Sequence, residues 1–264
     1  MSGVFFMGIG KLGKKEAKRD PRNFKLSNIL NKKKLSTLPA SFDCDKNLKG
    51  KIPAGLFGND KWGDCVMCSR ANMTLRFECF EQKKVIPITD NEVLMEYWAE
   101  QGGTSLTKPD DGLVVLDSLN EWRTKGWTAG NKNYDIYAFA EVDRANHEEV
   151  KTGIYHLNGV CAGFMLPVSA QGQFRWYMRW DVDACKCLGD TAVGSLGGHA
   201  VYICGYDSRG PVCITWGRKQ KMTWAFFDKY CDEAFCIVDN KDKFMADSPV
   251  DVEALDKYLH AITD

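Results

Sequence analysis

The sequence predicts an α+β protein of two lobes, with helices in the first half of its body and antiparallel strands in the second. Apolar residues recur every three or four positions between residues 65 and 125, which is the period of a helix packed on a core. After Gly130, short apolar runs separated by turn residues are typical of strands. We therefore expect a helical lobe at about 60–128, a β-rich lobe at about 129–240 and a cleft between them.

Three helices are expected in the helical lobe. The first begins at Cys65 and runs to about residue 80 without Gly or Pro. The second is capped by Asp90, and the third covers about residues 113–125. The side chains expected to face the core are Met67, Ala71, Leu75, Cys79, Val93, Leu94, Tyr97, Trp98, Leu116, Leu119 and Trp122.

Strands are expected to dominate the second half. The strand-like segments cover residues 134–142, 160–167, 174–182, 198–206, 212–216 and 235–238. Short helices are expected after Asn146, which can act as an N-cap, and over residues 224–230. Pro249 is expected at the first helical position of an amphipathic tail helix. Its apolar face would consist of Val252, Leu255, Leu259 and Ile262.

Charge is unevenly distributed, although the chain is neutral overall. Residues 1–37 contain ten Lys and Arg against Glu16 and Asp20, a net charge of +8, so the remaining 227 residues carry −8. This segment shows no period, which predicts an extended basic arm before a body at 38–240 and a tail at 241–264. Such an arm can dock on its own body, on an acidic partner or loosely on nucleic acid. We favour docking on the body or a solvated tail, because no nucleic-acid-binding module is recognisable.

The cysteines and the start of the chain indicate synthesis in a reducing cytoplasm. Among eleven cysteines, Cys65 with Cys68 and Cys185 with Cys187 are closely spaced, but a zinc site needs a second pair at matched spacing. We expect reduced thiols and no metal. The apolar run at residues 4–10 is too short to span a bilayer and differs from a secretory signal, so no membrane association is expected.

Two distant residues are candidates for nucleophilic catalysis. Cys65 follows a turn containing Gly63, at the start of the first helix, and His199 stands at the head of an apolar strand. A helix N-terminus lowers a thiol pKa and an imidazole can accept the proton, so we assign Cys65 as nucleophile and His199 as base. Asn59 can offer an amide to a developing oxyanion. The carboxylate of Asp64 is expected to turn outward, away from that negative charge.

The other polar motifs indicate structural roles. His147 and His156 are expected as surface or packing residues, and Asp110-Asp111 as a helix cap. No phosphate-binding glycine loop is recognisable, and no metal or organic cofactor is expected.

These segments resemble the landmarks of papain-family cysteine peptidases, in the same order. The matching segments are Leu38-Pro39-Ala40-Ser41-Phe42-Asp43, residues 59–69, Gly198-His199-Ala200-Val201 with Gly205-Tyr206, and Thr215-Trp216-Gly217. This resemblance covers roughly residues 38–240. The whole chain is also similar to uncharacterised papain-like proteins of bacteriophages and bacteria, including at residues 20–23 and 216–234. The resemblance implies a papain-like two-lobed fold.

The resemblance also implies roles for single residues. Cys65 takes the place of the nucleophile, His199 that of the base and Asn59 that of the oxyanion Gln. The six-residue spacing from Asn59 selects Cys65 over Cys68, because the residue six before Cys68 is Trp62, which has no side-chain amide.

Two departures from the family pattern bear on activity. Ile214 stands where the family has an Asn that orients the imidazole, and Ile cannot accept a hydrogen bond. Thr215 or a backbone carbonyl would have to orient the ring, and Trp216 would have to shield it. The shorter Asn59 replaces Gln.

Two functions follow from these observations. The first is a phage-encoded hydrolase that cleaves peptide bonds of a peptide or protein substrate through a Cys65–His199 dyad and a thioester intermediate. The alternative is a weak or inactive papain-like scaffold, a structural or interaction protein of the virion. Its partners would be virion proteins, bound through the basic arm or the C-terminal helix.

Overall fold

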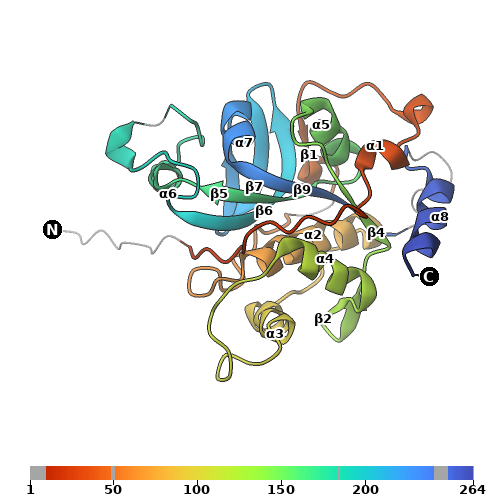
Figure 1. Ribbon diagram of the computed structural model, residues 1–264, viewed down its shortest axis with the longest axis horizontal. Coiled ribbons are helices and arrows are strands. Elements are labelled where there is room, and N and C mark those ends of the chain that lie inside the picture. The colour runs from red at the N-terminus through yellow and green to blue at the C-terminus, as the bar shows by residue number, and fades with distance from the viewer. Residues whose placement is uncertain (1–9, 49–50, 184, 241–248, 264) are drawn as a thin grey trace.

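The computed structural model describes residues 10–48, 51–183, 185–240 and 249–263. It has a mainly helical lobe and a lobe built on a seven-stranded sheet, and the N-terminal arm runs along the boundary between them (Figure 1). The apolar run at residues 4–10 lies outside the described residues except for Gly10. No helix within the described ranges is long and apolar enough to cross a membrane.

The helical lobe contains α2 (Cys65–Gln82), α3 (Asp90–Glu100), α4 (Val115–Thr124) and a hairpin of β2 (Trp127–Ala129) and β3 (Lys132–Tyr134). These are the three helices that the apolar spacing predicted. Every residue of α2 from Cys65 to Cys79 is buried, so this helix is enclosed on all sides instead of facing solvent on one. The cap of α3 is Thr89 and not Asp90, because Thr89 Oγ1 accepts from the Glu92 amide while the Glu92 carboxylate accepts from the Thr89 amide.

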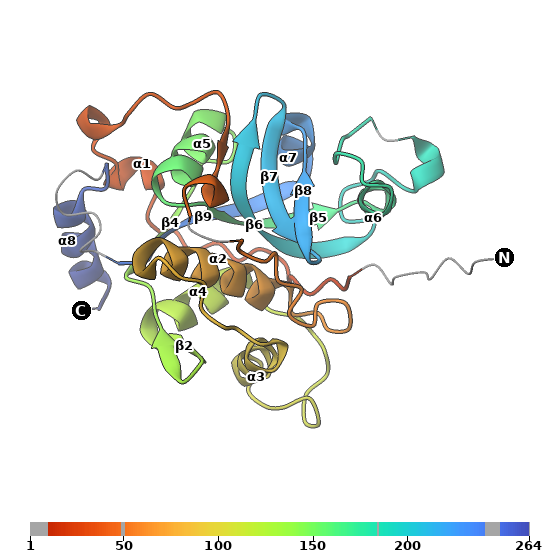
Figure 2. The same cartoon turned by 180° about the vertical axis from the view of Figure 1, so that it is seen from behind.

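The sheet lobe has the strand order β4-β9-β5-β6-β7-β8, all neighbours antiparallel, and β1 also pairs with β6. Figure 2 shows β6, β7 and β8 from the side opposite to Figure 1. Register places Gly163 of β5 opposite Ala200 of β6 and Glu233 of β9. The strands are β1 (Phe42–Asp43), β4 (Ala138–Glu141), β5 (Val160–Leu166), β6 (Gly197–Asp207), β7 (Gly210–Thr215), β8 (Arg218–Lys221) and β9 (Cys231–Val238). The helices of this lobe are α5 (His147–His156), α6 (Val168–Arg175) and α7 (Trp224–Tyr230).

Two predictions for this lobe were wrong. Residues 174–182 do not form a strand: α6 ends at Arg175, and the aromatic residues behind it suggested a strand although only Trp180 makes a β-bridge, to Met222. The edge strand β8 was missed because its sequence, Arg-Lys-Gln-Lys, has no apolar alternation. β8 pairs with β7 and stands at the end of the strand order. Charged residues are tolerated at such an edge of a sheet.

The C-terminal helix packs against the N-terminal arm. The tail helix α8 (Val252–Thr263) contacts α1 (Leu26–Ile29) of the arm, and the Phe24 and Tyr258 rings touch. The helix begins three residues after Pro249, because Asp251 provides the cap by accepting from the Ala254 amide. The tail thus packs within the molecule. Three short 3₁₀ turns complete the chain, at Lys32–Lys34, Cys44–Asn47 and Lys186–Leu188.

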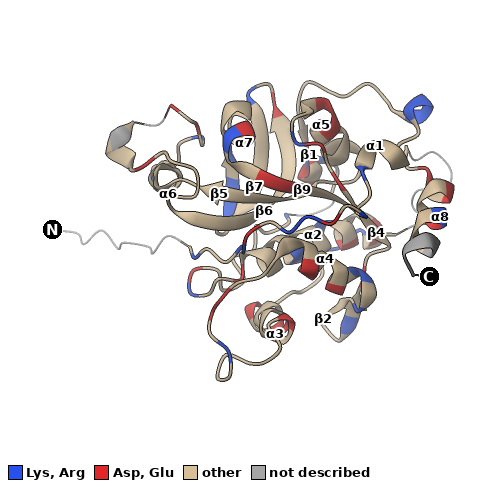
Figure 3. Cartoon of the chain, in the orientation of Figure 1, with Lys and Arg blue, Asp and Glu red and all other residues tan. Residues whose placement is uncertain are grey.

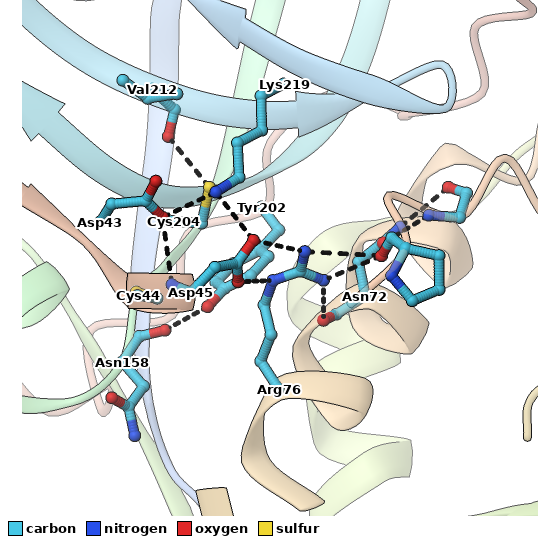
Figure 4. Close-up of polar contacts among 12 residues, drawn as sticks. Asp43, Cys44, Asp45, Asn72, Arg76, Asn158, Tyr202, Cys204, Val212 and Lys219 are labelled. Atoms are coloured by element: carbon cyan, nitrogen blue, oxygen red, sulfur yellow. Dashed lines mark hydrogen bonds and ion pairs between the residues drawn. The ribbon is translucent and has the colours of Figure 1, made fainter. Parts of the chain in front are cut away.

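A buried ion-pair network joins α2 to the sheet lobe (Figure 4). The Arg76 guanidinium, 1% exposed, donates to both carboxylate oxygens of Asp45 at 2.8 and 3.1 Å. The Lys219 ammonium on β8 lies 2.7 Å from Asp45 Oδ2 and 2.6 Å from Asp43 Oδ1. Since Arg76 is on the same helix as Cys65, this network fixes the position of the helix against the sheet.

Replacing Arg76 should therefore destabilise the protein more than breaking a surface pair. We expect Arg76→Met to lower the free energy of unfolding by about 2 kcal/mol, less than a fully buried pair because Asp45 is partly exposed and keeps Lys219. Lys257→Ala, which removes the exposed pair with Glu253, should cost clearly less, because an exposed ion pair contributes little to stability. Urea unfolding measures both, and equal losses would contradict the assigned role of Arg76.

Candidate active site

Cys65 and His199, predicted to meet, come from the start of α2 and the head of β6. Cys65 is 1% exposed, and its sulfur accepts a hydrogen bond from the Ala200 amide at 3.3 Å. Ala200 is the residue after His199, so the thiol lies beside the strand that carries the imidazole. Cys65 and His199 are 134 positions apart in the sequence, and the fold brings the Cys65 thiol to the amide of the residue that follows His199.

The imidazole of His199 is held on two sides. Its Nε2 lies 2.6 Å from Thr215 Oγ1, and its ring stacks on Trp216 with centroids 4.5 Å apart and an interplanar angle of 27°. The sequence left open whether Thr215 or a backbone carbonyl would orient the ring. The Thr215 side chain is the group that contacts it. Ile214 is buried within β7. Nδ1 of His199 is buried and makes no hydrogen bond to any described residue.

Burial controls the protonation of both groups. It raises the pKa of the Cys65 thiol to about 12 and lowers the pKa of His199 to about 3. In this state both side chains are therefore neutral near pH 7. A thiolate attacks carbonyl carbons far better than a thiol, so this arrangement holds Cys65 in its less nucleophilic form.

The turn before Cys65 is anchored by Asp110. The Gly63 amide donates to both oxygens of this carboxylate at 3.0 Å, the Tyr97 hydroxyl also donates to it, and the Gly112 amide donates to Tyr97 at 3.1 Å. The prediction that Asp110 caps a helix was wrong, because α4 begins only at Val115. The sequence singled out the Asp110-Asp111 pair but offered no signal linking it to a turn 47 residues away.

The structure also locates Asn59 and Asp64. The Asn59 side-chain amide donates to the Trp62 carbonyl at 3.0 Å. The prediction that Asp64 turns outward was wrong, since its side chain is fully buried and neither oxygen is hydrogen-bonded within the described ranges. The cause is that α2 enters the core at its first residue, so the residue before it already lies inside. Burial raises the pKa of Asp64 to about 7.

The N-terminal arm covers this site from the sheet side. The amides of Gly13 and Lys14 both donate to the Gly198 carbonyl, at 3.3 and 3.2 Å. The Trp216 indole donates to the Lys11 carbonyl at 3.1 Å. The arm is thus bonded to the residue before His199 and to the ring that stacks on His199.

The same segment is bonded to the helical lobe. The Lys11 amide donates to the Asn59 carbonyl at 2.5 Å, and the Leu113 amide donates to the Gly13 carbonyl at 2.7 Å. The Lys15 amide donates to the Leu113 carbonyl at 2.8 Å. Residues 10–15 therefore bridge the two lobes.

The arm lies close to the backbone on both sides of the cleft. A Cβ atom on Gly13 would lie 1.6 Å from the Gly63 carbonyl oxygen, and one on Gly198 would lie 2.0 Å from the Lys14 oxygen. Burial is the largest influence on the pKa of Cys65 and raises it. The Gly13 amide is one of the backbone groups that lower this pKa. The arm is thus packed directly against the turn before Cys65 and against the residue before His199.

Charge supports this docking farther along the arm. Lys18 pairs with Asp117 at 2.8 Å and Lys25 with Glu141 at 2.6 Å. Figure 3 shows Lys and Arg along the arm where it passes between the lobes. Of the two outcomes favoured for the basic arm, docking on its own body and a solvated tail, the structure has the first.

The eleven cysteines of the chain divide into two groups. Nine cysteines, Cys65 and Cys68 among them, are free and buried, as expected. The expectation of reduced thiols was wrong for Cys185 and Cys187, whose Cα atoms lie 5.2 Å apart and whose sulfurs are joined as a disulfide. In the part of the chain that the structure describes, no group of three or more His, Cys, Asp or Glu side chains is arranged to hold a metal ion.

Comparison with known proteins identifies the fold. No family model and no curated protein matches the chain. Xylellain, a cysteine protease from Xylella fastidiosa, superposes with a TM-score of 0.65 at 14% identity, over 91% of this chain and 100% of that one. The chain has a papain-like fold. This was the fold predicted from the sequence.

Two further solved structures superpose on this chain over most of its length and most of their own. Procathepsin B S9 from Trypanosoma congolense gives a TM-score of 0.55 at 15% identity, over 89% of this chain and 87% of that one. The Carica candamarcensis cysteine protease CMS1MS2, in complex with E-64, gives 0.51 at 13% identity, over 77% and 100%. The likeness therefore extends over both lobes.

The buried carboxylate of Asp64 should make stability depend on pH. Its pKa is near 3.9 in an unfolded chain and about 7 here, so the folded protein loses stability as the pH rises from 4 to 7. Asp64→Asn cannot ionise, so its stability relative to wild type should rise by about 4 kcal/mol between pH 4 and 8, because each of the roughly three pKa units is worth about 1.4 kcal/mol.

Urea unfolding at several pH values measures this difference. Asp111→Asn, the same substitution at an exposed position, serves as the matched control. A pH-independent difference for Asp64→Asn would show that the carboxylate titrates alike in the folded and unfolded chains.

Proposed function

We propose that this chain is a cysteine hydrolase that cleaves peptide bonds with Cys65 as nucleophile and His199 as base, and that the arm holds it in a closed state. The observation that carries the proposal is the meeting of the first residue of α2 with the head of β6, at the Cys65–Ala200 contact. The names of the structures with the same fold support it, since xylellain and CMS1MS2 are described as cysteine proteases.

Displacement of the arm is the first step of the proposed mechanism. Water then reaches the site, the desolvation that raises the pKa of Cys65 and lowers that of His199 is relieved, and the partial positive charge of the helix N-terminus favours the thiolate. With the ring proton on Nε2 donated to Thr215, the free Nδ1 accepts the proton of Cys65.

The chemical steps are those of acyl transfer. The Cys65 sulfur attacks the peptide carbonyl carbon, and a carbon–sulfur bond forms as the carbonyl oxygen takes the negative charge. His199 returns its proton to the nitrogen, and the carbon–nitrogen bond breaks to release the amine. Water, deprotonated by His199, then cleaves the thioester and releases the acid. The Cys65 amide donates to the oxyanion, and Asn59 joins it by exchanging its bond to Trp62.

A second candidate is a papain-like scaffold without catalytic activity. It is favoured by the low exposure of Cys65, by the apolar Ile214 at the position of the usual orienting residue, and by the arm in the cleft. In this candidate the chain is phage-encoded, is made in a reducing cytoplasm and joins the virion through its arm or α8. The phage origin and the virion partners are expectations from the sequence resemblance.

Peptide hydrolysis by a full-length chain with the arm displaced distinguishes the two candidates. Gly13→Val places a side chain where Gly63 leaves no room, so it should expel residues 10–15 from the cleft. We expect this variant to cleave a peptide mixture, and adding Cys65→Ala or His199→Ala to reduce the rate by at least ~1000-fold.

Cys68→Ala is the matched control for the nucleophile, because Cys68 is a buried cysteine one helical turn away. In the Gly13→Val background it should keep its rate within about threefold. Folding of each variant is checked by circular dichroism. A folded Gly13→Val chain that binds peptides without cleaving them would favour the scaffold.

A further inference from the structure

Asp110 binds the turn that leads into Cys65 through both oxygens of its carboxylate. The Gly63 amide donates to Oδ1 and Oδ2 at 3.0 Å each, and the Tyr97 hydroxyl donates to Oδ1 as well. Asp110 is exposed, so these bonds are not needed to satisfy an acid trapped in the core. Hydrogen bonds to an ionised carboxylate are stronger than bonds between neutral groups. The contact therefore gives the turn a firm external support.

This turn supplies both donors that the proposed mechanism directs at the oxyanion. Gly63 is two residues before Cys65, whose amide is the first donor, and Asn59 carries the second donor on its side chain. The Asn59 side-chain amide is bonded to the Trp62 carbonyl at 3.0 Å. Trp62 and Gly63 share one peptide unit, so that unit has its oxygen on Asn59 and its N–H on Asp110.

The Trp62–Gly63 peptide unit cannot rotate without changing both bonds. A peptide unit is planar, and its carbonyl and N–H point in opposite directions. Asp110 fixes the N–H and so fixes the carbonyl that Asn59 contacts. Gly63 lacks a side chain because a Cβ there would lie 2.7 Å from the Leu12 carbonyl oxygen. Since glycine is the residue whose backbone rotates most freely, this turn needs a partner outside itself to hold its orientation.

Tyr97 connects the same carboxylate to the segment with which the arm pairs. Its side chain comes from α3 and is 0% exposed, and its hydroxyl accepts from the Gly112 amide at 3.1 Å. Gly112 precedes Leu113, whose amide and carbonyl are bonded to the backbone of the arm. A backbone that lies on Leu113 is therefore linked, through Tyr97 and Asp110, to the turn that carries the oxyanion donors.

We propose that Asp110 and Tyr97 are positioning residues for the oxyanion. They hold the Trp62–Gly63 peptide unit so that the Cys65 amide and the Asn59 side chain are oriented before the reaction begins, and donors fixed in advance need no reorganisation as charge develops. Water at the exposed carboxylate screens its negative charge from the oxyanion. The inference rests on the proposed hydrolase function, because it concerns the oxyanion of that reaction.

Two reactions of Cys65 separate the positioning of the oxyanion donors from the positioning of the thiol. Iodoacetamide forms a carbon–sulfur bond at a saturated carbon and releases iodide, so no oxyanion arises. N-acetylglycinal, a small aldehyde without a side chain, adds the sulfur to its carbonyl carbon while the thiol proton moves to the carbonyl oxygen. That oxygen takes the place of the oxyanion. The affinity of the aldehyde is measured by its protection of Cys65 from iodoacetamide.

We expect Asp110→Ala to weaken aldehyde binding at least ~10-fold in the full-length Gly13→Val chain, and to leave the alkylation rate without aldehyde within about threefold. Asp110→Asn keeps one acceptor oxygen and should bind the aldehyde more tightly than Asp110→Ala. Tyr97→Phe, which removes only the hydroxyl, should also weaken aldehyde binding.

Asp111→Asn, at the neighbouring exposed position, is the matched control and should leave both quantities within about threefold. Circular dichroism checks that each variant folds. A folded Asp110→Ala chain with unchanged aldehyde affinity would overturn the proposal. So would a loss of the same factor in aldehyde affinity and in alkylation rate, since it would show that Asp110 acts on the thiol or on the fold as a whole.

Peptide hydrolysis by the same full-length chains then separates this proposal from the proposed function. We expect Asp110→Ala to lower kcat at least ~10-fold and to leave KM within about threefold, because the oxyanion forms only after binding. Hydrolysis at an unchanged rate would overturn the positioning role while leaving the hydrolase intact. Aldehyde binding that depends on Asp110, with no peptide hydrolysis, would overturn the hydrolase while leaving the positioning role intact. An aldehyde that gives Cys65 no protection in the Gly13→Val chain would overturn both.

Discussion

The contact between the first residue of α2 and the head of β6 is the constraint on which the rest of the site depends. It joins the helical lobe to the sheet lobe at one point, and the buried pair of Arg76 with Asp45 holds the same helix farther along. Because α2 is enclosed along most of its length, Cys65 is buried as soon as the helix begins. The same burial that positions the thiol also keeps it protonated.

The arm completes that burial. It joins the two lobes through backbone hydrogen bonds, which require no particular side chains, and it is fixed in place by the buried ammonium of Lys14, which pairs with Asp232 and Glu233. The arm carries a net charge of +8 and the rest of the chain −8. These opposite charges meet in the buried ion pair of Lys14 and in the surface pairs of Lys18 and Lys25.

The sequence predicted the parts of this arrangement that depend on local pattern. Helical spacing placed α2, the apolar run after His199 predicted β6, and the resemblance joined them in one fold. The sequence could not predict contacts made by tertiary structure alone. Asp110 binds the Gly63 amide from 47 residues away, and Lys14 meets Asp232 and Glu233 from more than 200 residues away. Neither pairing leaves a periodic signal. Asp64 was misplaced because a carboxylate is expected to seek water, whereas here the path of the chain forces it inside.

The central claim is that the arm controls the reactivity of Cys65, and the rate of Cys65 alkylation by iodoacetamide tests it most directly. Peptide mass spectrometry follows labelling at Cys65 in the folded full-length chain, with the buried Cys68 as an internal reference. The account predicts that Gly13→Val reacts on the order of 100-fold faster than wild type at Cys65, which corresponds to a docking free energy of about 3 kcal/mol. Equal rates in the two folded proteins would contradict it.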